Sequence, residues 1–85
     1  MLTIKVLGPG CANCKRLDQI AHKVVQELNK EAEIIKVTDY NEIAAYNILS
    51  TPGLVINEKV VSWGRIPSIQ EVTDWIINAA EPEAA

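Results

Sequence analysis

Residues 8–17 of the chain read G-P-G-C-A-N-C-K-R-L, and they stand where one hydrophobic pattern gives way to another. The preceding run, L-T-I-K-V-L at residues 2–7, has the apolar content of a strand, and residues 8–10 break it. Beyond Cys11, apolar residues recur at three- and four-residue steps from Leu17 to Leu28, which predicts a helix. The stretch therefore predicts a strand, a tight turn and a helix that opens with a C-x-x-C pair.

A second strand and a second helix are predicted in the middle of the chain. Apolar residues centred on Ile35 predict a strand over residues 33–38. Asp39, with Glu42 three residues later, has the form of a capping box, so a helix is expected to follow. Residues 50–53, S-T-P-G, should end that helix. Its apolar face is expected to comprise Ile43, Tyr46 and Leu49.

The last third of the chain predicts a hairpin and a final helix. Residues 54–56 and 60–63 look like strands, and the short connection between them requires antiparallel pairing. Ser68 and Glu71 form a second capping box at the start of the last helix. The predicted order is β-α-β-α-β-β-α, an α/β fold in which a four-stranded mixed sheet is flanked by three helices.

Length and composition favour a single domain without structural disulfides. The chain has 85 residues, of which 48% are apolar, so it has room for one core and enough apolar surface to fill it. A bridge between Cys11 and Cys14 would close so short a loop that it would constrain the unfolded chain very little. We expect one domain over residues 1–80 and a flexible C-terminal tail over residues 81–85.

Charge and hydropathy argue against nucleic-acid and membrane binding. Eight basic and 11 acidic residues give a net charge of −3, and no Lys/Arg block is present to meet phosphates. No apolar run approaches the roughly 18–20 residues that a membrane helix needs. Lys5 interrupts the first apolar stretch, which is unlike a signal peptide. We therefore expect a cytoplasmic protein, and in a reducing cytosol a C-x-x-C either cycles or binds a metal.

The cysteine pair, taken alone, is compatible with metal chelation or with redox chemistry. Its position at a strand-to-helix junction favours reversible disulfide formation, because two residues in a helical turn hold the side chains close enough to bridge. Unpaired backbone N–H groups and the positive end of the helix dipole should surround the first sulfur. We therefore expect the thiol pKa of Cys11 to lie below the free-cysteine value of about 8.5, and Cys14 to be less exposed.

The element order, the G-P-G-C-A-N-C-K-R-L stretch and T-P-G at residues 51–53 together resemble the thioredoxin superfamily. The likeness is strongest to its small, glutaredoxin-sized redox-active disulfide proteins and covers residues 2–79. It implies a thioredoxin-like fold and a dithiol oxidoreductase without a cofactor, an enzyme of electron transport and cell redox homeostasis. The residues between the cysteines leave both the reductase and the oxidase direction open, and the expected cytoplasmic location favours a protein-disulfide reductase. The implied partners are disulfide-containing proteins and a recycling reductase, and the chain itself is expected to be a monomer.

The resemblance also implies roles for particular residues. Cys11 would attack a substrate disulfide, and Cys14 would resolve the mixed disulfide that results. Thr51-Pro52 matches the position of a cis proline that faces the cysteines, so the Thr51 backbone is expected to pair with an extended substrate segment. Gly64 matches a glycine that lies beside the active site and lets the substrate approach.

The chain departs from the thioredoxin pattern in several positions. Ala12 and Asn13 replace the Gly-Pro between the cysteines, and Gly10 stands where tryptophan is usual. Lys5 occupies the position of a buried acid that assists proton transfer, and we expect it on the solvated face of an edge or partly exposed strand. The residues alone name no substitute acid. His22 lies about two helical turns beyond Cys14, too far to serve as a general base for Cys11, and is expected to be a surface residue.

Other functions stay open on the sequence alone. A glutaredoxin-like activity with glutathione would use the same cysteines, although residues 63–66, W-G-R-I, replace the Gly-Gly-Asp-like feature of glutaredoxins. Metal binding would require a dimer that shares two cysteine pairs, because zinc prefers four ligands, and we expect no metal. A redox-regulated adaptor that turns over little is a further alternative.

Overall fold

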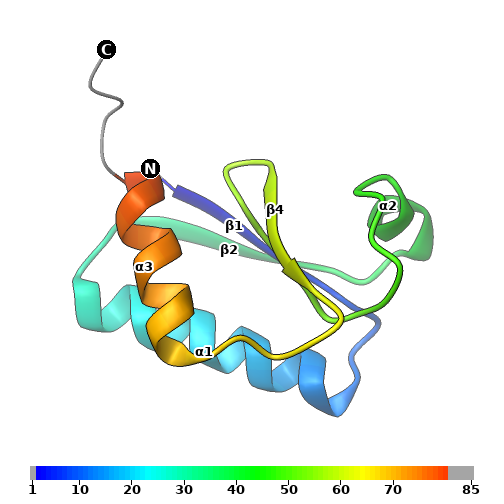
Figure 1. Cartoon of the computed structure of the whole chain (residues 1–85), viewed down its shortest axis with the longest axis horizontal. Coiled ribbons are helices and arrows are strands. Elements are labelled where there is room, and N and C mark those ends of the chain that lie inside the picture. Colours follow the sequence, from blue (N-terminus) through cyan, green and yellow to red (C-terminus); the bar gives the residue numbers. More distant parts are fainter. Residues whose placement is uncertain (1, 81–85) are drawn as a thin grey trace.

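A mixed four-stranded sheet with the strand order β2-β1-β3-β4 forms the centre of the molecule. The computed structural model describes residues 2–80, and the tail predicted at residues 81–85 lies outside them. β1 pairs in parallel with β2 and antiparallel with β3 (Figure 1). β3 pairs antiparallel with β4, as the short connection between them predicted, and the sheet is mixed as expected. The strands are β1 (Leu2–Leu7), β2 (Ala32–Val37), β3 (Gly53–Ile56) and β4 (Lys59–Trp63).

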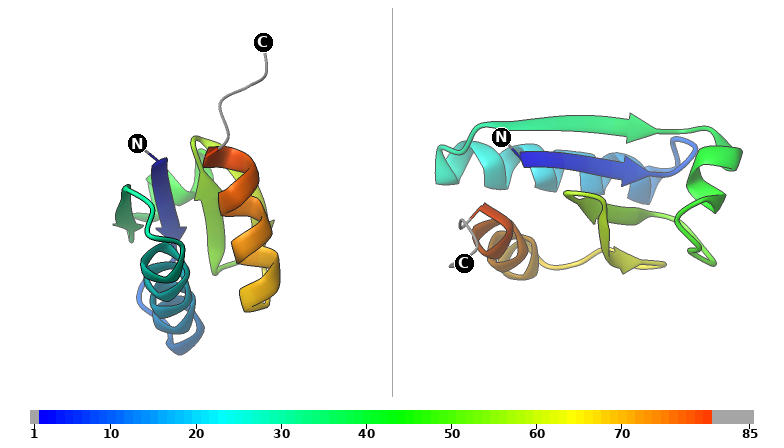
Figure 2. Two further views of the ribbon diagram at one scale, coloured as in Figure 1. Left: turned by 90° about the vertical axis from the view of Figure 1, so that its left-hand side faces the viewer. Right: turned by 90° about the horizontal axis from the view of Figure 1, so that it is seen from above.

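Two long helices cover one face of the sheet. α1 (Ala12–Leu28) and α3 (Ile69–Ala80) lie side by side (Figure 2), and their apolar residues pack with those of β1 and β3 in the larger core cluster. Burial of each Val, Leu or Ile in it stabilises the fold by roughly 1.5–3 kcal/mol, so this cluster makes the larger apolar contribution. Its buried members are Leu2, Ile4, Val6, Leu17, Ala21, Val24, Leu54, Ile56, Val72 and Ile76.

A short helix, α2 (Tyr40–Ala44), lies on the opposite face and caps a smaller cluster. Adjacent residues of a strand point to opposite faces, so Leu7 of β1 belongs to this cluster while Val6 belongs to the first. The buried members of the smaller cluster are Leu7, Val37, Ile43 and Val55.

The predicted length of the second helix is wrong. The helix ends at Ala44 instead of continuing to Leu49, a residue that is 85% exposed. Asn47 has a left-handed backbone with φ of 59°, so the chain leaves the helical path before Leu49 can reach the sheet. Asp39 caps the helix as predicted, although its carboxylate accepts a hydrogen bond from the N–H of Asn41 at 2.7 Å.

The segment between β4 and α3 is held by a capping box and an ion pair. Glu71 N–H donates to Ser68 Oγ at 3.1 Å and Ser68 N–H donates to Glu71 Oε1 at 3.0 Å, which confirms the predicted capping box. Arg65 donates two further hydrogen bonds to the same carboxylate, at 3.1 and 2.8 Å. The Arg65 guanidinium, followed by the Ser68 backbone, lowers the pKa of Glu71 to about 2.

Glu71→Gln is expected to make the fold less stable at neutral pH but not in strong acid. A carboxyl whose pKa is depressed in the folded state stabilises it above the ordinary value of 4.5, and this contribution disappears as the pH falls toward about 2. Urea midpoints of wild type and Glu71→Gln should therefore differ from pH 7 to 5 and converge between pH 4.5 and 2. Glu27→Gln, an exposed glutamate of α1, is the control, and a pH-independent difference for Glu71→Gln would contradict the assignment.

Candidate active site

The two cysteines lie at the start of α1, just after β1 ends. Cys11 is the N-cap residue, and its sulfur is bonded to that of Cys14 in the first turn, with the Cα atoms 5.0 Å apart. Cys11 Sγ also accepts a hydrogen bond from the Cys14 N–H at 3.2 Å, which satisfies one of the N–H groups left unpaired at a helix start. Cys11 is exposed, whereas Cys14 is 4% exposed, as predicted.

Gly8 provides the space for the buried sulfur. A Cβ atom on Gly8 would overlap Cys14 Sγ and lie 3.1 Å from Cys14 Cβ. The backbone of Gly8 is itself fixed, because its N–H donates to the carbonyl of Val37 in β2 at 2.9 Å. From the sequence Gly8 is only a strand breaker, since its packing role depends on where the helix meets the strand in space.

The loop before β3 brings Thr51 to the same position. Thr51 Cβ lies 3.8 Å from the point that a Cβ on Gly8 would occupy, so Thr51 and Cys14 approach one point. The Thr51-Pro52 peptide bond is cis, as the resemblance implied. The carbonyl of the buried Pro52 accepts a hydrogen bond from Gly64 N–H at 2.9 Å. All five residues singled out from the sequence are therefore linked in one region.

Gly64 adjoins the proline side of this region rather than the disulfide. Its φ of +78° is unfavourable for residues with a Cβ, and a Cβ there would lie 2.6 Å from Ser50 Oγ. Glycine thus allows the end of β4 to approach the loop at residues 50–52.

Comparison with known proteins agrees with this geometry. Residues 2–77 match the family model described as thioredoxin domain. The chain belongs to the thioredoxin-domain family. It is 40% identical over 74 residues to a thioredoxin of Methanocaldococcus jannaschii, in an alignment that covers 87% of this chain and 85% of the relative. It is 33% identical over 72 residues to a thioredoxin of Methanothermobacter thermautotrophicus, covering 85% of this chain and 94% of the relative.

Membership of the thioredoxin family and the Cys11–Cys14 disulfide together make the chain a thiol–disulfide oxidoreductase. The thioredoxin-like α/β fold implied by the resemblance is confirmed. Proteins of this family act on disulfide substrates and have a reductase as a partner. Disulfide substrates and a reductase are therefore the general classes of partner for this chain.

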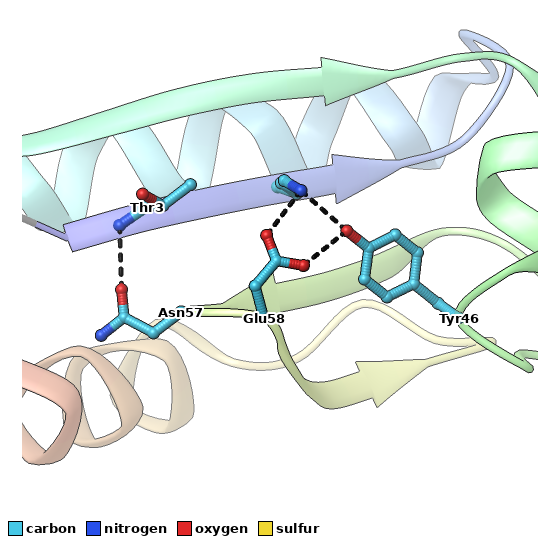
Figure 3. Close-up of polar contacts among 5 residues, drawn as sticks. Thr3, Tyr46, Asn57 and Glu58 are labelled. Atoms are coloured by element: carbon cyan, nitrogen blue, oxygen red, sulfur yellow. Dashed lines mark hydrogen bonds and ion pairs between the residues drawn. The ribbon is translucent and has the colours of Figure 1, made fainter.

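Lys5, which stands where the thioredoxin pattern has an acid, belongs to a polar cluster on the face away from α1. β1 is an interior strand, so an edge position is excluded, and the Lys5 side chain is 21% exposed and paired rather than solvated. Its Nζ lies 2.6 Å from Glu58 Oε2 and donates to Tyr46 OH at 2.8 Å, while Tyr46 OH donates to Glu58 Oε1 at 2.9 Å (Figure 3).

The charges of this cluster are mutually stabilised. The hydrogen bond to Glu58, followed by that to Tyr46, raises the pKa of Lys5 above its usual range. The same bond from Lys5, followed by that from Tyr46, lowers the pKa of Glu58. Lys5 is therefore a permanent cation that ties β1 to the β3–β4 turn and to the segment after α2.

A cavity of about 240 Å³ lies beside the buried sulfur, and the sequence did not predict it. Its lining includes Cys14, Gly8, Lys36 and Thr38. Lys36 is the register partner of Val6, so its side chain lies on the face of the sheet that α1 covers. Alternation along β2 shows which residues share a face with Lys36, but that this is the face covered by α1 follows only from the pairing of β2 with β1.

Two further findings apply to residues 2–80. No group of three or more His, Cys, Asp or Glu side chains in this range lies close enough to hold a metal ion. Within the same range, every helix is too short or too polar to cross a membrane.

Gly8→Ala is expected to destabilise the reduced protein by about 1–3 kcal/mol, because the added methyl group overpacks the site of the Cys14 sulfur. The same substitution in a Cys14→Ala background should cost distinctly less, since the sulfur that it would overlap has been removed. Urea unfolding of wild type, Gly8→Ala, Cys14→Ala and the double variant under reducing conditions measures the loss in free energy of unfolding in each background. Equal costs in the two backgrounds would show that the contact with the sulfur is not the cause.

Proposed function

We propose that the chain reduces disulfides of protein substrates through a Cys11/Cys14 dithiol–disulfide cycle. The observation that carries the proposal is the unequal burial of the two bridged sulfurs, because Cys11 is exposed at a helix N-terminus and Cys14 is 4% exposed. A sulfur of a partner protein has access to Cys11 but not to Cys14. Cys11 is therefore the attacking residue and Cys14 the resolving one.

In the first step, the Cys11 thiolate attacks one sulfur of the substrate disulfide. A bond forms between Cys11 Sγ and that sulfur, the substrate S–S bond breaks, and the departing sulfur takes the electron pair and then a proton. The N-cap position favours the thiolate, because the Cys14 N–H points at Cys11 Sγ and the helix dipole places partial positive charge there.

In the second step, Cys14 attacks Cys11 Sγ. The Cys11–Cys14 bond forms, the bond between Cys11 and the substrate breaks, and the second substrate sulfur leaves with the electron pair and is protonated. The substrate disulfide has then gained two electrons and two protons, and the cysteine pair has lost them. A recycling reductase restores the dithiol by supplying two electrons and two protons.

Thr51, Pro52 and Gly64 are proposed to bind the substrate. Thr51 lies next to the Gly8–Cys14 contact, so a substrate segment attached to Cys11 would pass along the Thr51 backbone and pair with it by β-type hydrogen bonds. Gly64, bonded to the Pro52 carbonyl, would keep the adjoining end of β4 free of a side chain.

We assign this reaction to the cytoplasm, with the chain acting as a monomer. A C-x-x-C pair in a reducing compartment cycles instead of persisting as a structural bridge. Protein disulfides are favoured over glutathione because residues 63–66 lack the Gly-Gly-Asp-like feature of glutaredoxins. Faster reduction of a glutathione mixed disulfide than of insulin would favour glutathione instead.

Cys14→Ser is expected to stall the cycle after its first step. The reduced variant, mixed with insulin, should accumulate a mixed disulfide through Cys11, visible by non-reducing electrophoresis and mass spectrometry. Its rate of turnover should fall by on the order of 10³-fold or more, as is typical when one residue of a catalytic set that acts as a unit is removed. Cys11→Ser, the matched control, should form no adduct, and insulin reduction by Cys11→Ser at the wild-type rate would refute the assignment.

The N-cap position of Cys11 should lower the pH at which its thiol becomes reactive. In reduced Cys14→Ser, alkylation of Cys11 by iodoacetamide is expected to be half-maximal below pH 8.5, the value of about 8.5 being that of a free thiol. The same protein in concentrated urea is the control, because unfolding removes the helix and should return the midpoint to the free value. Identical midpoints in the two states would contradict activation by the N-cap.

A further inference from the structure

Asp18 is a largely buried carboxylate that the cycle above leaves without a role. Its side chain is 13% exposed, and its Oδ1 atom is buried without a hydrogen-bond partner among the described residues. Lys36 Nζ lies 3.5 Å from Oδ2, and His22 Nε2 lies 3.5 Å from Oδ1 without the geometry of a hydrogen bond. A buried acceptor without a donor is unfavourable, so it requires an explanation.

The buried sulfur belongs to the helical turn that precedes this carboxylate. Asp18 lies four residues after Cys14, and residues at that spacing share one face of an α-helix. Side chains in a helix lean toward its N-terminus, so the Asp18 side chain leans toward the turn that contains Cys14. Lys36 links the two, because it lines the cavity of about 240 Å³ beside Cys14 and also contacts Asp18.

We propose that Asp18 accepts the proton of the Cys14 thiol when Cys14 resolves the mixed disulfide. The inference rests on the proposed cycle, in which Cys14 is a thiol once Cys11 has reacted with the substrate. In the bridged form Cys14 Sγ carries no proton, so it cannot donate a hydrogen bond to Oδ1. After reduction the thiol can supply a donor to Oδ1, directly or through one water molecule.

The proton and the electrons balance in this step. The Asp18 carboxylate takes the Cys14 proton as the Cys14 sulfur attacks Cys11 Sγ, so the Cys11–Cys14 bond forms. The bond between Cys11 and the substrate breaks with its electron pair on the substrate sulfur, which is then protonated at the expense of the Asp18 carboxyl group or of solvent. The titratable groups around this carboxylate are Lys36 at Oδ2, His22 at 3.5 Å from Oδ1, and Lys15, which lines the cavity beside Cys14.

Asp18→Asn tests the proposal, because the amide has the shape of the carboxylate but is a far weaker base. Reduced wild type and variant are mixed with a disulfide-linked peptide dimer and quenched with acid, and free thiols are then alkylated. Mass spectrometry separates the dithiol, mixed-disulfide and bridged forms. At pH 7 the mixed disulfide should form within twofold of the wild-type rate, whereas its resolution should be slower by roughly tenfold or more.

A pH series separates proton transfer from a structural effect. As the pH rises, hydroxide in the solvent increasingly removes the Cys14 proton without help from Asp18, so the resolution rate of Asp18→Asn should approach that of wild type toward about pH 10. Asp18→Glu keeps a carboxylate and should recover part of the rate at pH 7. Asp74→Asn makes the same chemical change on an exposed residue of α3 and should leave resolution unchanged.

Equal resolution rates for wild type and Asp18→Asn at pH 7 would overturn the inference. A defect of constant size from pH 6 to 10 would also overturn it, because a distorted helix would produce that result. A wild type that forms no Cys11 adduct would instead refute the proposed cycle, and the inference with it. If the unfolding transition shows that Asp18→Asn does not fold, Asp18→Ala is taken through the same series with the same expected pattern.

Discussion

The packing of the Cys14 sulfur against the backbone of Gly8 is the constraint on which the rest of the site depends. The N–H of Gly8 donates a hydrogen bond to the carbonyl of Val37 in β2, so the sheet fixes the position of Gly8. The sulfur occupies the volume that a side chain at residue 8 would need, and α1 can therefore begin directly against the end of β1. Thr51 reaches the same point, which joins the helix start, the strand end and the proline loop.

This contact also explains how two chemically identical residues come to differ. Cys11, as the N-cap, has an extended backbone with φ of −67° and ψ of 167°, so its side chain lies outside the helix and faces the unpaired N–H groups. Cys14 is already helical, and its side chain points inward to the space at Gly8. One helical turn thus separates the exposed sulfur of Cys11, where the helix dipole favours an anion, from the buried sulfur of Cys14.

Features that depend on neighbours in the chain could be predicted from the sequence. The strand before the cysteines, the helix after them and the Ser68–Glu71 capping box each involve residues a few positions apart, and all three are present. The helix expected to reach Leu49 failed because the left-handed backbone at Asn47 is not evident from apolar spacing. The positions of Cys11, Cys14 and the proline loop followed from the family resemblance more than from periodicity.

Features that depend on strand register could not be predicted in this way. The partner of Lys5 is 53 positions away, and Lys36 meets Asp18 only because β2 lies beside β1 over α1.

Strand alternation then decides which lysine can act near the buried sulfur. Val6 faces α1, so Lys5, its neighbour in β1, faces the opposite side and is held there by Glu58 and Tyr46. Lys36, the register partner of Val6, faces α1 and reaches the cavity beside Cys14. The charged groups around the buried sulfur therefore come from α1 and β2, while the position that carries an acid in the thioredoxin pattern stabilises the far face of the sheet. A residue's role in this fold follows from the face it occupies and the partner it meets there, and the same position can serve the chemistry in one chain and the packing in another.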